Sequence, residues 1–349
     1  MMKADKQQPG ANQLDLFAPA TSTASPQPQK KRRQQFEVRP APLPSELQPV
    51  AQSLPETIRL GTSSWSFPGW EGLIYDRSAP QTQLSREGLT IYSQHPLLRT
   101  VGVDRTYYRP MTAAQFATYA EQVPDTLRFL VKAHKYCTLN RFSDHPRYGT
   151  RRRQQNGLFL DPQYATQEVV GTFMDGLQDK AGSLLFQFSP QDFAQLGGPE
   201  YFVERLHRFL DALPRGPLYA VELRNAEVFT PEYVDALSAA GACHCLNGHP
   251  SMPPIRDQAA LAQPEPALAV VIRRMQVRHL SYQTAKEKYA PFNQIVDADL
   301  TSRNAIAELC LDATARQHPA YVIVNNKAEG SAPLSIFHLA EQIVAKINM

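Results

Sequence analysis

The stretch AYVIVNNKAEGSAPLSIFHLAEQIVAKI, residues 320–347, contains the pattern that decides the fold. Its first seven residues are a short apolar run that ends in the polar pair Asn325 and Asn326. After a loop containing Gly330, apolar residues recur at helical spacing over residues 333–347. A buried strand followed by an amphipathic helix is the repeating unit of parallel α/β proteins.

The same unit recurs along the chain from residue 57 onward. Eight apolar runs have the length of strands, at residues 57–63, 99–104, 127–134, 183–189, 218–225, 242–247, 268–274 and 320–326. Helical patterns separate most of them, at residues 84–94, 112–122, 163–179, 200–213, 231–240 and 298–317. The sixth unit is the exception, because residues 248–266 are rich in Pro and read mostly as loop. Eight such units predict a TIM-type (β/α)₈ barrel over residues 57–349.

Residues 1–56 have a different composition. They are rich in Pro, Gln, Ser and Thr and carry the basic run Lys30–Arg33. Such a segment cannot bury enough apolar surface to offset its ordering entropy, so the sequence predicts a disordered N-terminal arm before the barrel.

The amino-acid composition restricts the class of protein and its location in the cell. The 349 residues are 42% hydrophobic, yet no run of about 18 apolar residues and no secretory signal are present. The four cysteines, Cys137, Cys243, Cys245 and Cys310, lack the paired spacing of a zinc site or a disulfide framework. These features predict a cytoplasmic globular protein. The formal net charge of +3 is too small to identify a polyanionic partner.

In a (β/α)₈ barrel the chemistry lies at the carboxyl ends of the strands, so the polar residues there are the candidate site. The sequence predicts catalytic roles for five of them: Asp104, Lys132, His134, Glu222 and Arg224. It predicts substrate binding by Trp65, Arg105, Gln187, Asn247, Arg273, Asn325, Asn326 and Lys327. Strand ends are polar in every barrel because they meet water, so the set is more informative than any member.

Two pairs share a strand face because their members are two residues apart. Glu222 and Arg224 form one pair, and a carboxylate beside a guanidinium stays ionised, either in the site or as a structural ion pair. Lys132 and His134 form the other, which is typical of an anion clamp or a proton-donor pair.

A long loop follows the third strand, over residues 135–162. It carries several arginines, among them Arg151, Arg152 and Arg153, with interleaved aromatic residues. Arginine with aromatic residues suits phosphate contact and base stacking, although a solvated charge run has the same composition. Together with small residues near Gly330 at the start of the last helix, this loop predicts a phosphate-bearing ligand.

The blocks GTSSWSFPGWEGLIY, VGVDRTYYRP, FLVKAH, LLFQFSP, YAVELRN and VIVNNKAEGSAP, taken in this order, resemble the signature blocks of the YecE-like family, domain of unknown function number seventy-two. The resemblance runs from about Ile58 to the C-terminus and implies a TIM-type barrel of no established reaction. Where many members have a Glu in the second block this chain has Gly102, with Asp104 two residues later as its substitute.

Within the arm, Gln13, Leu14, Asp15, Leu16 and Phe17 resemble the pentapeptide with which many bacterial polymerases and repair proteins bind the replication sliding clamp. Leu16 and Phe17 would fill an apolar pocket, and a flexible arm would let the barrel move over DNA. The alternatives are an accidental apolar patch and a tail segment that folds back on the barrel.

Three functions remain open from the sequence. The first is an enzyme of DNA maintenance that is recruited by the sliding clamp, binds DNA backbone and acts as a hydrolase of the nuclease or phosphodiesterase type. The second is an enzyme acting on a phosphorylated sugar or small metabolite, and the third is a clamp-recruited DNA-binding module without catalysis. The sequence leaves the cofactor open: a divalent metal is a candidate, but Asp104, His134, Glu222 and His249 do not define its ligands.

Overall fold

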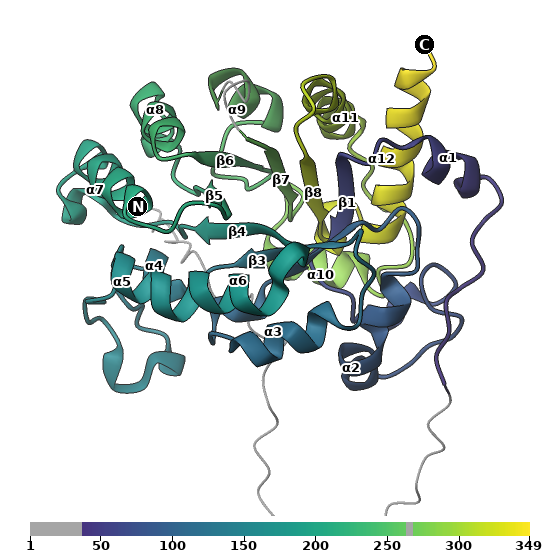
Figure 1. Cartoon of the computed structure of the whole chain (residues 1–349), viewed down its shortest axis with the longest axis horizontal. Coiled ribbons are helices and arrows are strands. Elements are labelled where there is room, and N and C mark those ends of the chain that lie inside the picture. The colour runs from purple at the N-terminus through teal and green to yellow at the C-terminus, as the bar shows by residue number, and fades with distance from the viewer. Residues whose placement is uncertain (1–36, 263–267) are drawn as a thin grey trace, which may run out of the picture.

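The computed structural model describes residues 37–262 and 268–349, and eight strands in this part close into a parallel barrel in chain order, β1 to β8 (Figure 1). The predicted TIM-type barrel is therefore confirmed. The strands are β1 (Ile58–Thr62), β2 (Thr100–Val103), β3 (Arg128–Lys132), β4 (Ala181–Gln187), β5 (Leu218–Glu222), β6 (Ala242–Asn247), β7 (Val270–Arg274) and β8 (Ala320–Val324).

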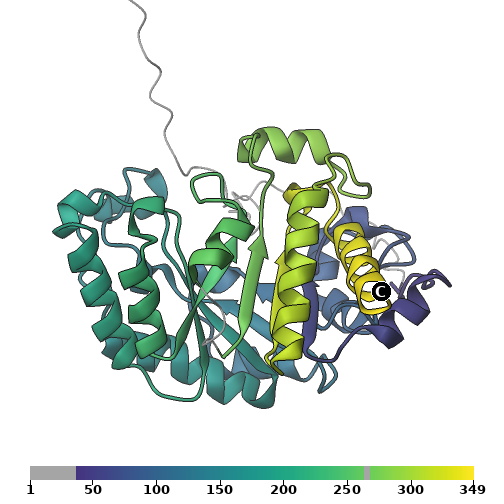
Figure 2. The same ribbon diagram turned by 90° about the horizontal axis from the view of Figure 1, so that it is seen from above.

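Helices surround the barrel, and every predicted helix is found with shifted ends (Figures 1 and 2). The α-helices are α1 (Leu47–Ser53), α2 (Gln81–Tyr92), α3 (Ala113–Ala120), α4 (Lys135–Thr138), α5 (Pro162–Ala165), α6 (Gly171–Leu177), α7 (Pro199–Asp211), α8 (Pro231–Ala239), α9 (Ile255–Ala262), α10 (Tyr282–Tyr289), α11 (Leu300–Ala315) and α12 (Ala332–Ile347). Short 3₁₀ turns include Arg105–Tyr107 after β2 and Asn326–Ala328 after β8, and a π-helical segment, Thr166–Val170, joins α5 to α6.

Four of the described α-helices, α1, α4, α9 and α10, lie in segments where the sequence predicted none. In α9 only Ile255 and Gln258 are buried, and Gln258 is polar, so the helix has no apolar periodicity to detect. In α10 the buried residues are Ala285 and Tyr289. Figure 2 shows α10 set crosswise to α11 at one end of the barrel.

Residues 37–56 pack against the barrel, although the sequence analysis assigned them to the arm. Helix α1 lies against α12, and Leu47, Ala51 and Leu54 are buried. The side chain of Arg99 fixes this segment by donating to the carbonyl groups of Ala51, Leu54 and Pro55 over 2.8–3.1 Å. The pentapeptide 13–17 and the basic run 30–33 lie outside the described residues.

The inside of the barrel is filled by side chains. A cluster of nine buried residues occupies it: Leu130, Leu185, Ala220, Cys243, Cys245, Val271, Met275, Tyr321 and Ile323. Cys243 and Cys245 are thus packed core residues, as their spacing on one strand suggests. A filled interior is typical of the fold and leaves the carboxyl ends of the strands as the place for a site. Of the helices in the described parts of the chain, none is both long enough and apolar enough to cross a membrane.

Candidate functional site

A cavity of about 710 Å³ lies at the carboxyl ends of the strands. Eight of the predicted site residues border it: Asp104, Lys132, Glu222, Arg224, Asn247, Arg273, Asn325 and Lys327. They come from the ends of β2, β3, β5, β6, β7 and β8 or from the residues just after them. The barrel therefore gathers in one place side chains that are up to 223 residues apart in the sequence, from Asp104 to Lys327.

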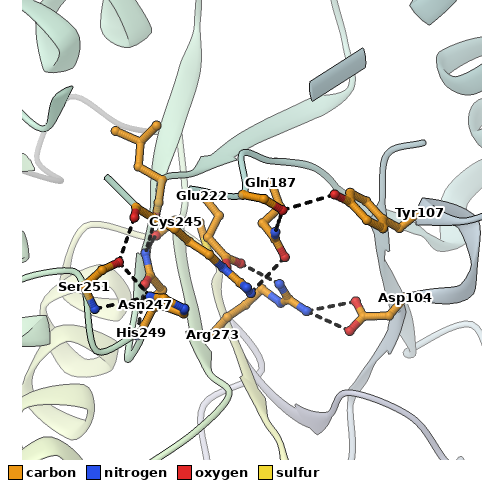
Figure 3. A network of polar contacts seen from close by, with 12 residues as sticks. Asp104, Tyr107, Gln187, Glu222, Cys245, Asn247, His249, Ser251 and Arg273 are labelled. Carbon is orange, nitrogen blue, oxygen red and sulfur yellow. Dashed lines mark hydrogen bonds and ion pairs between the residues drawn. The ribbon is translucent and has the colours of Figure 1, made fainter. Parts of the chain in front are cut away.

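Arg273 connects two carboxylates across the barrel (Figure 3). Its guanidinium donates to Glu222 Oε2 over 2.5 Å and to both oxygens of Asp104 over 2.8 and 3.0 Å. Arg273 and Glu222 are each 0% exposed. Burial lowers the pKa of Arg273, but the nearby carboxylates of Asp104 and Glu222 raise it by more. The net pKa lies above the ordinary value, so this guanidinium stays charged.

Glu222 is held from a second side by Arg224. The Arg224 Nε donates to Glu222 Oε1 over 3.1 Å, and its Nη2 donates to Gln187 Oε1 over 2.9 Å. Burial raises the pKa of Glu222, but Arg273, Arg224 and Lys132 outweigh it and lower that pKa to about 2. The pair predicted from its spacing on β5 therefore exists and is ionised. It is both a part of the cavity wall and a structural ion pair.

Lys132, at the end of β3, is only 1% exposed although it borders the cavity. Its Nζ lies 3.9 Å from the centroid of the Tyr107 ring, and within the described residues no carboxylate is at ion-pair distance from it. Burial lowers its pKa to about 7, Arg273 and Arg224 lower it too, and Asp104 and Glu222 oppose them. This amine is therefore close to half neutral at neutral pH.

A second buried lysine, Lys327, follows β8. It is 4% exposed, and its Nζ lies 4.4 Å from the centroid of the Tyr282 ring. Burial lowers its pKa to about 8, and Lys286 lowers it as well. The backbone N–H of Lys327 donates to the Oδ1 atom of Asn325. The Nδ2 atom of Asn325 in turn donates to Ser63 Oγ over 2.7 Å. Asn325 thus orients the loop that carries Lys327.

The β6 side of the cavity consists of Asn247 and His249 (Figure 3). Asn247 Nδ2 donates to the carbonyl oxygen of Leu223 over 3.1 Å, and its Oδ1 accepts from the His249 backbone over 3.1 Å. Burial lowers the pKa of His249 to about 4, so the ring is neutral at neutral pH. Its Nδ1 lies 2.7 Å from Ser251 Oγ.

His134 does not border the cavity that Lys132 lines, so the structure does not bring the predicted pair together there. His134 is the N-cap residue of helix α4, and its ring packs beside Tyr164 and not at the cavity. Its Nδ1 lies 2.6 Å from the Tyr164 hydroxyl, and burial lowers its pKa to about 4.

Four further predicted residues do not border the cavity: Trp65, Arg105, Gln187 and Asn326. Trp65 packs edge-on against Tyr119, with ring centroids 5.2 Å apart, and Arg105 donates to the Tyr119 hydroxyl. Gln187 lies behind Arg224, as described above. Asn326 Oδ1 accepts from Trp70 Nε1 and from the Ala332 backbone, which is a structural role at the start of α12.

Arg151, Arg152 and Arg153 of the long loop are exposed and do not border the cavity. Arg153 pairs with Asp144, Arg151 donates to the Tyr136 hydroxyl, and Arg152 donates to the carbonyl oxygen of Gly149. The first half of the same loop does contribute to the cavity wall, through Asn140, Arg141, Phe142, Ser143 and Tyr148.

The cavity wall formed after β7 was not predicted from the sequence. Gln276, Ser281, Tyr282 and Gln283 border the cavity and belong to the segment that leads into α10. This segment has a weak apolar pattern, and its place at the mouth follows only from its packing against the turn after β8. Tyr107 and His249 were visible beside strand ends but were not assigned to the site.

Within residues 37–262 and 268–349, no three His, Cys, Asp or Glu side chains converge in a way that could hold a metal ion. The two carboxylates deepest in the cavity, Asp104 and Glu222, are both hydrogen-bonded to Arg273.

Comparison with known proteins supports the fold. A DUF72 family protein from Thermotoga maritima superposes with a TM-score of 0.54 at 18% identity, covering 82% of this chain and 98% of that one. A DUF72 family protein from Enterococcus faecalis gives a TM-score of 0.53 at 15% identity, with 84% and 96% covered. At these identities the likeness concerns the fold alone. No curated protein matches the chain.

The family model described as "Protein of unknown function DUF72" matches residues 59–348, which is nearly the whole barrel. This agrees with the resemblance carried by the sequence blocks. The chain therefore belongs to the DUF72 family.

Proposed function

We propose that this protein is an enzyme acting on a small substrate that carries a phosphate or a similar anionic group, bound in the cavity at the barrel mouth. This is the phosphorylated-metabolite alternative left open by the sequence. One observation carries it: Lys132 and Lys327 are buried in the cavity wall, and within the described residues neither has a carboxylate at ion-pair distance.

The charges around the cavity are unequal. Five cationic side chains border it, Lys132, Arg141, Arg224, Arg273 and Lys327, against the three acidic ones Asp104, Asp192 and Glu222. Arg273 and Arg224 already neutralise Glu222, and Arg273 also binds Asp104. Burying an unpaired cation is costly, and an anionic ligand compensates that cost. Arg141 and Asp192 are exposed, so among the buried side chains the excess positive charge falls on the two lysines.

The size of the cavity suits a small molecule. A volume of about 710 Å³ lies within the range of sites for metabolites and cofactors. Aromatic rings of Tyr107, Tyr108 and Tyr282 line it beside the cations, so that one part of a ligand can be held by charge and another by apolar contact.

Recruitment to the sliding clamp, and with it DNA maintenance by a hydrolase or by a non-catalytic module, stays a prediction from residues 13–17. The same cationic cavity suits a nucleic-acid phosphate. A small substrate is favoured because the unpaired cations are buried, whereas Arg151, Arg152 and Arg153 are exposed and lie off the cavity.

The test is calorimetric titration of the protein with inorganic phosphate and with a set of sugar phosphates. Lys132→Met and Lys327→Met should each weaken binding by about 10- to 100-fold, since a charge-assisted hydrogen bond contributes about 1.5–3 kcal/mol. Lys346→Met is the matched control, because that lysine pairs with Glu308 on the outer helices α11 and α12. Equal affinities in all four proteins, or no binding at millimolar phosphate, would overturn the proposal.

A further inference from the structure

Lys132 occupies a position in which its ammonium form is disfavoured from several sides. Its side chain is 1% exposed at the end of β3, and its Nζ faces the Tyr107 ring at 3.9 Å. Among the residues that the structure describes, none accepts a hydrogen bond from this nitrogen, and the guanidinium groups of Arg273 and Arg224 are close enough to repel its charge. The amine nevertheless borders the cavity, so a ligand can reach it.

Lysines in such places are activated nucleophiles. A desolvated lysine beside other cations loses its proton readily, and the neutral amine attacks carbonyl carbons. The carboxylates that would keep it protonated, Asp104 and Glu222, are held by Arg273 instead. The ion-pair network thus fixes the cavity wall and leaves the Lys132 nitrogen available.

We propose that Lys132 is a catalytic nucleophile that forms an imine with an aldehyde or ketone group of the substrate, while the anionic end of the same molecule is held by Lys327. This inference rests on the proposed function and specifies its substrate class as a phosphorylated carbonyl compound. Lys327 suits the second role because it is a second buried cation on the same cavity.

The reaction balances without an added oxidant or reductant. The Lys132 nitrogen attacks the carbonyl carbon, a C–N bond forms, and the carbonyl oxygen takes up a proton to give a carbinolamine. That oxygen then leaves as water, which contains both protons of the amine, and a C=N double bond remains. Hydrolysis runs the same steps in reverse and releases the carbonyl compound.

The state of the amine supports this chemistry. The Lys132 pKa of about 7 leaves roughly half of the molecules neutral at pH 7. A lysine with an ordinary pKa of about 10.4 is neutral in only about one molecule in 2,500 at that pH. Carbonyl reagents should therefore select Lys132 over exposed lysines.

The experiment uses pyridoxal 5′-phosphate, an aldehyde that carries a phosphate, with borohydride to reduce any imine to a stable amine. The full-length protein is incubated with a stoichiometric amount of this probe at pH 7, reduced, digested and mapped by mass spectrometry. We expect one phosphopyridoxyl group per chain, located on Lys132, and protection by excess inorganic phosphate. The labelling rate should rise with a midpoint near pH 7.

Two variants complete the design. Lys132→Met should lose the label, and Lys135→Met should keep it, because Lys135 is a neighbouring lysine that does not border the cavity. Mapping in the wild-type protein decides the case even if Lys132→Met fails to fold. A label spread over other lysines with Lys132 unmodified, while phosphate still binds, would overturn this inference alone. Failure of phosphate to bind at all would overturn the proposed function as well.

Discussion

The Arg273 guanidinium, at the end of β7, donates a 2.5 Å hydrogen bond to the Glu222 carboxylate at the end of β5, and neither residue is exposed to solvent. Arg273 also binds Asp104 from β2, so one cation joins three parts of the barrel mouth. Two of the three carboxylates that border the cavity, Asp104 and Glu222, are thereby engaged in ion pairs that hold the barrel mouth together. What remains for a ligand are the lysines, Lys132 and Lys327.

Removing one partner of this network should destabilise the protein strongly. Arg273→Met leaves Glu222 buried without its main counter-charge, which costs about 3–5 kcal/mol of unfolding free energy. Arg208→Met is the control, because Arg208 forms an exposed pair with Glu204 that contributes at most about 1 kcal/mol. Urea unfolding followed by circular dichroism measures both. Similar small losses in the two variants would contradict a structural role for the buried network.

The lowered pKa of Glu222 predicts an acid-sensitive part of the stability. Its folded-state pKa of about 2 lies below the ordinary value of 4.5, so the stabilisation is complete above pH 4.5 and is lost as the pH falls toward 2. Glu222→Gln removes this contribution, and its unfolding free energy should therefore depend less on pH in that window. Urea titrations at pH 2, 3, 4 and 5 compare the two proteins, and parallel pH curves would exclude Glu222 as the titrating group.

Anion binding in the cavity should depend on pH in the neutral to mildly alkaline range, where the two buried lysines lose their protons. The ammonium forms of Lys132 and Lys327, with pKa values of about 7 and 8, bind an anion, and the neutral amines do not. Sulfate is the suitable probe, because its charge is constant between pH 5 and 10, and its affinity should fall as the pH rises through 7 and 8. Lys132→Met should remove the step near pH 7 and keep the one near pH 8. A flat profile in the wild-type protein would disprove sulfate binding by these lysines.

Much of this site was predictable because it follows from strand geometry. The order of apolar runs indicates the barrel, and the residue that ends each run indicates which side chains meet, as Lys132, Glu222 and Arg273 do. Spacing on one strand also predicted the Glu222–Arg224 pair correctly. It did not place His134 at the cavity, because this residue caps helix α4 and its ring contacts Tyr164.

Other features depend on contacts that no local pattern encodes. The bond between Arg273 and Asp104 joins residues 169 positions apart, and only barrel closure brings them together. Helix α9 presents the polar Gln258 to the core, where its amide accepts from Asn247 and donates to two carbonyl groups. Hydrogen bonds thus satisfy the polar atoms of this buried side chain, and a hydrophobic pattern in the sequence does not reveal such bonds.

The packing of residues 37–56 changes what a truncation should do. Deleting residues 1–56 removes the buried Leu47 and Leu54, each contributing about 1.5–3 kcal/mol, and takes from Arg99 its three carbonyl partners. We expect a loss of several kcal/mol of unfolding free energy, whereas a chain that begins at residue 37 should retain the stability of the full-length protein. Thermal unfolding of the three proteins gives the comparison. Equal midpoints for the chains beginning at residues 37 and 57 would show that α1 does not stabilise the barrel.

Replacing Arg151, Arg152 and Arg153 by Ala distinguishes ligand binding in the cavity from DNA binding by the loop. These side chains are exposed and do not border the cavity, so phosphate affinity should be unchanged in the triple variant. Titration with DNA at several salt concentrations tests the other function of the loop. Each lost phosphate contact lowers the salt dependence of binding, and a reduced slope would assign DNA contact to these arginines. Weaker phosphate binding in the triple variant would contradict the prediction that these arginines take no part in ligand binding in the cavity.

The sliding-clamp prediction is tested with a peptide and a matched truncation. A peptide of residues 9–21 should bind the bacterial clamp with an affinity dominated by Leu16 and Phe17, because these two side chains supply most of the apolar area. Each contributes about 1.5–3 kcal/mol when buried, so replacing both by Ala should weaken binding by roughly two orders of magnitude or more. The chain beginning at residue 37 is the matched control for the intact protein, since it lacks the pentapeptide and retains α1 and the barrel. Surface plasmon resonance on immobilised clamp should detect the intact protein and not this truncation. Equal binding by the Leu16→Ala, Phe17→Ala double variant would mean that the motif is a coincidence, and the cavity would then remain the basis for assigning a function.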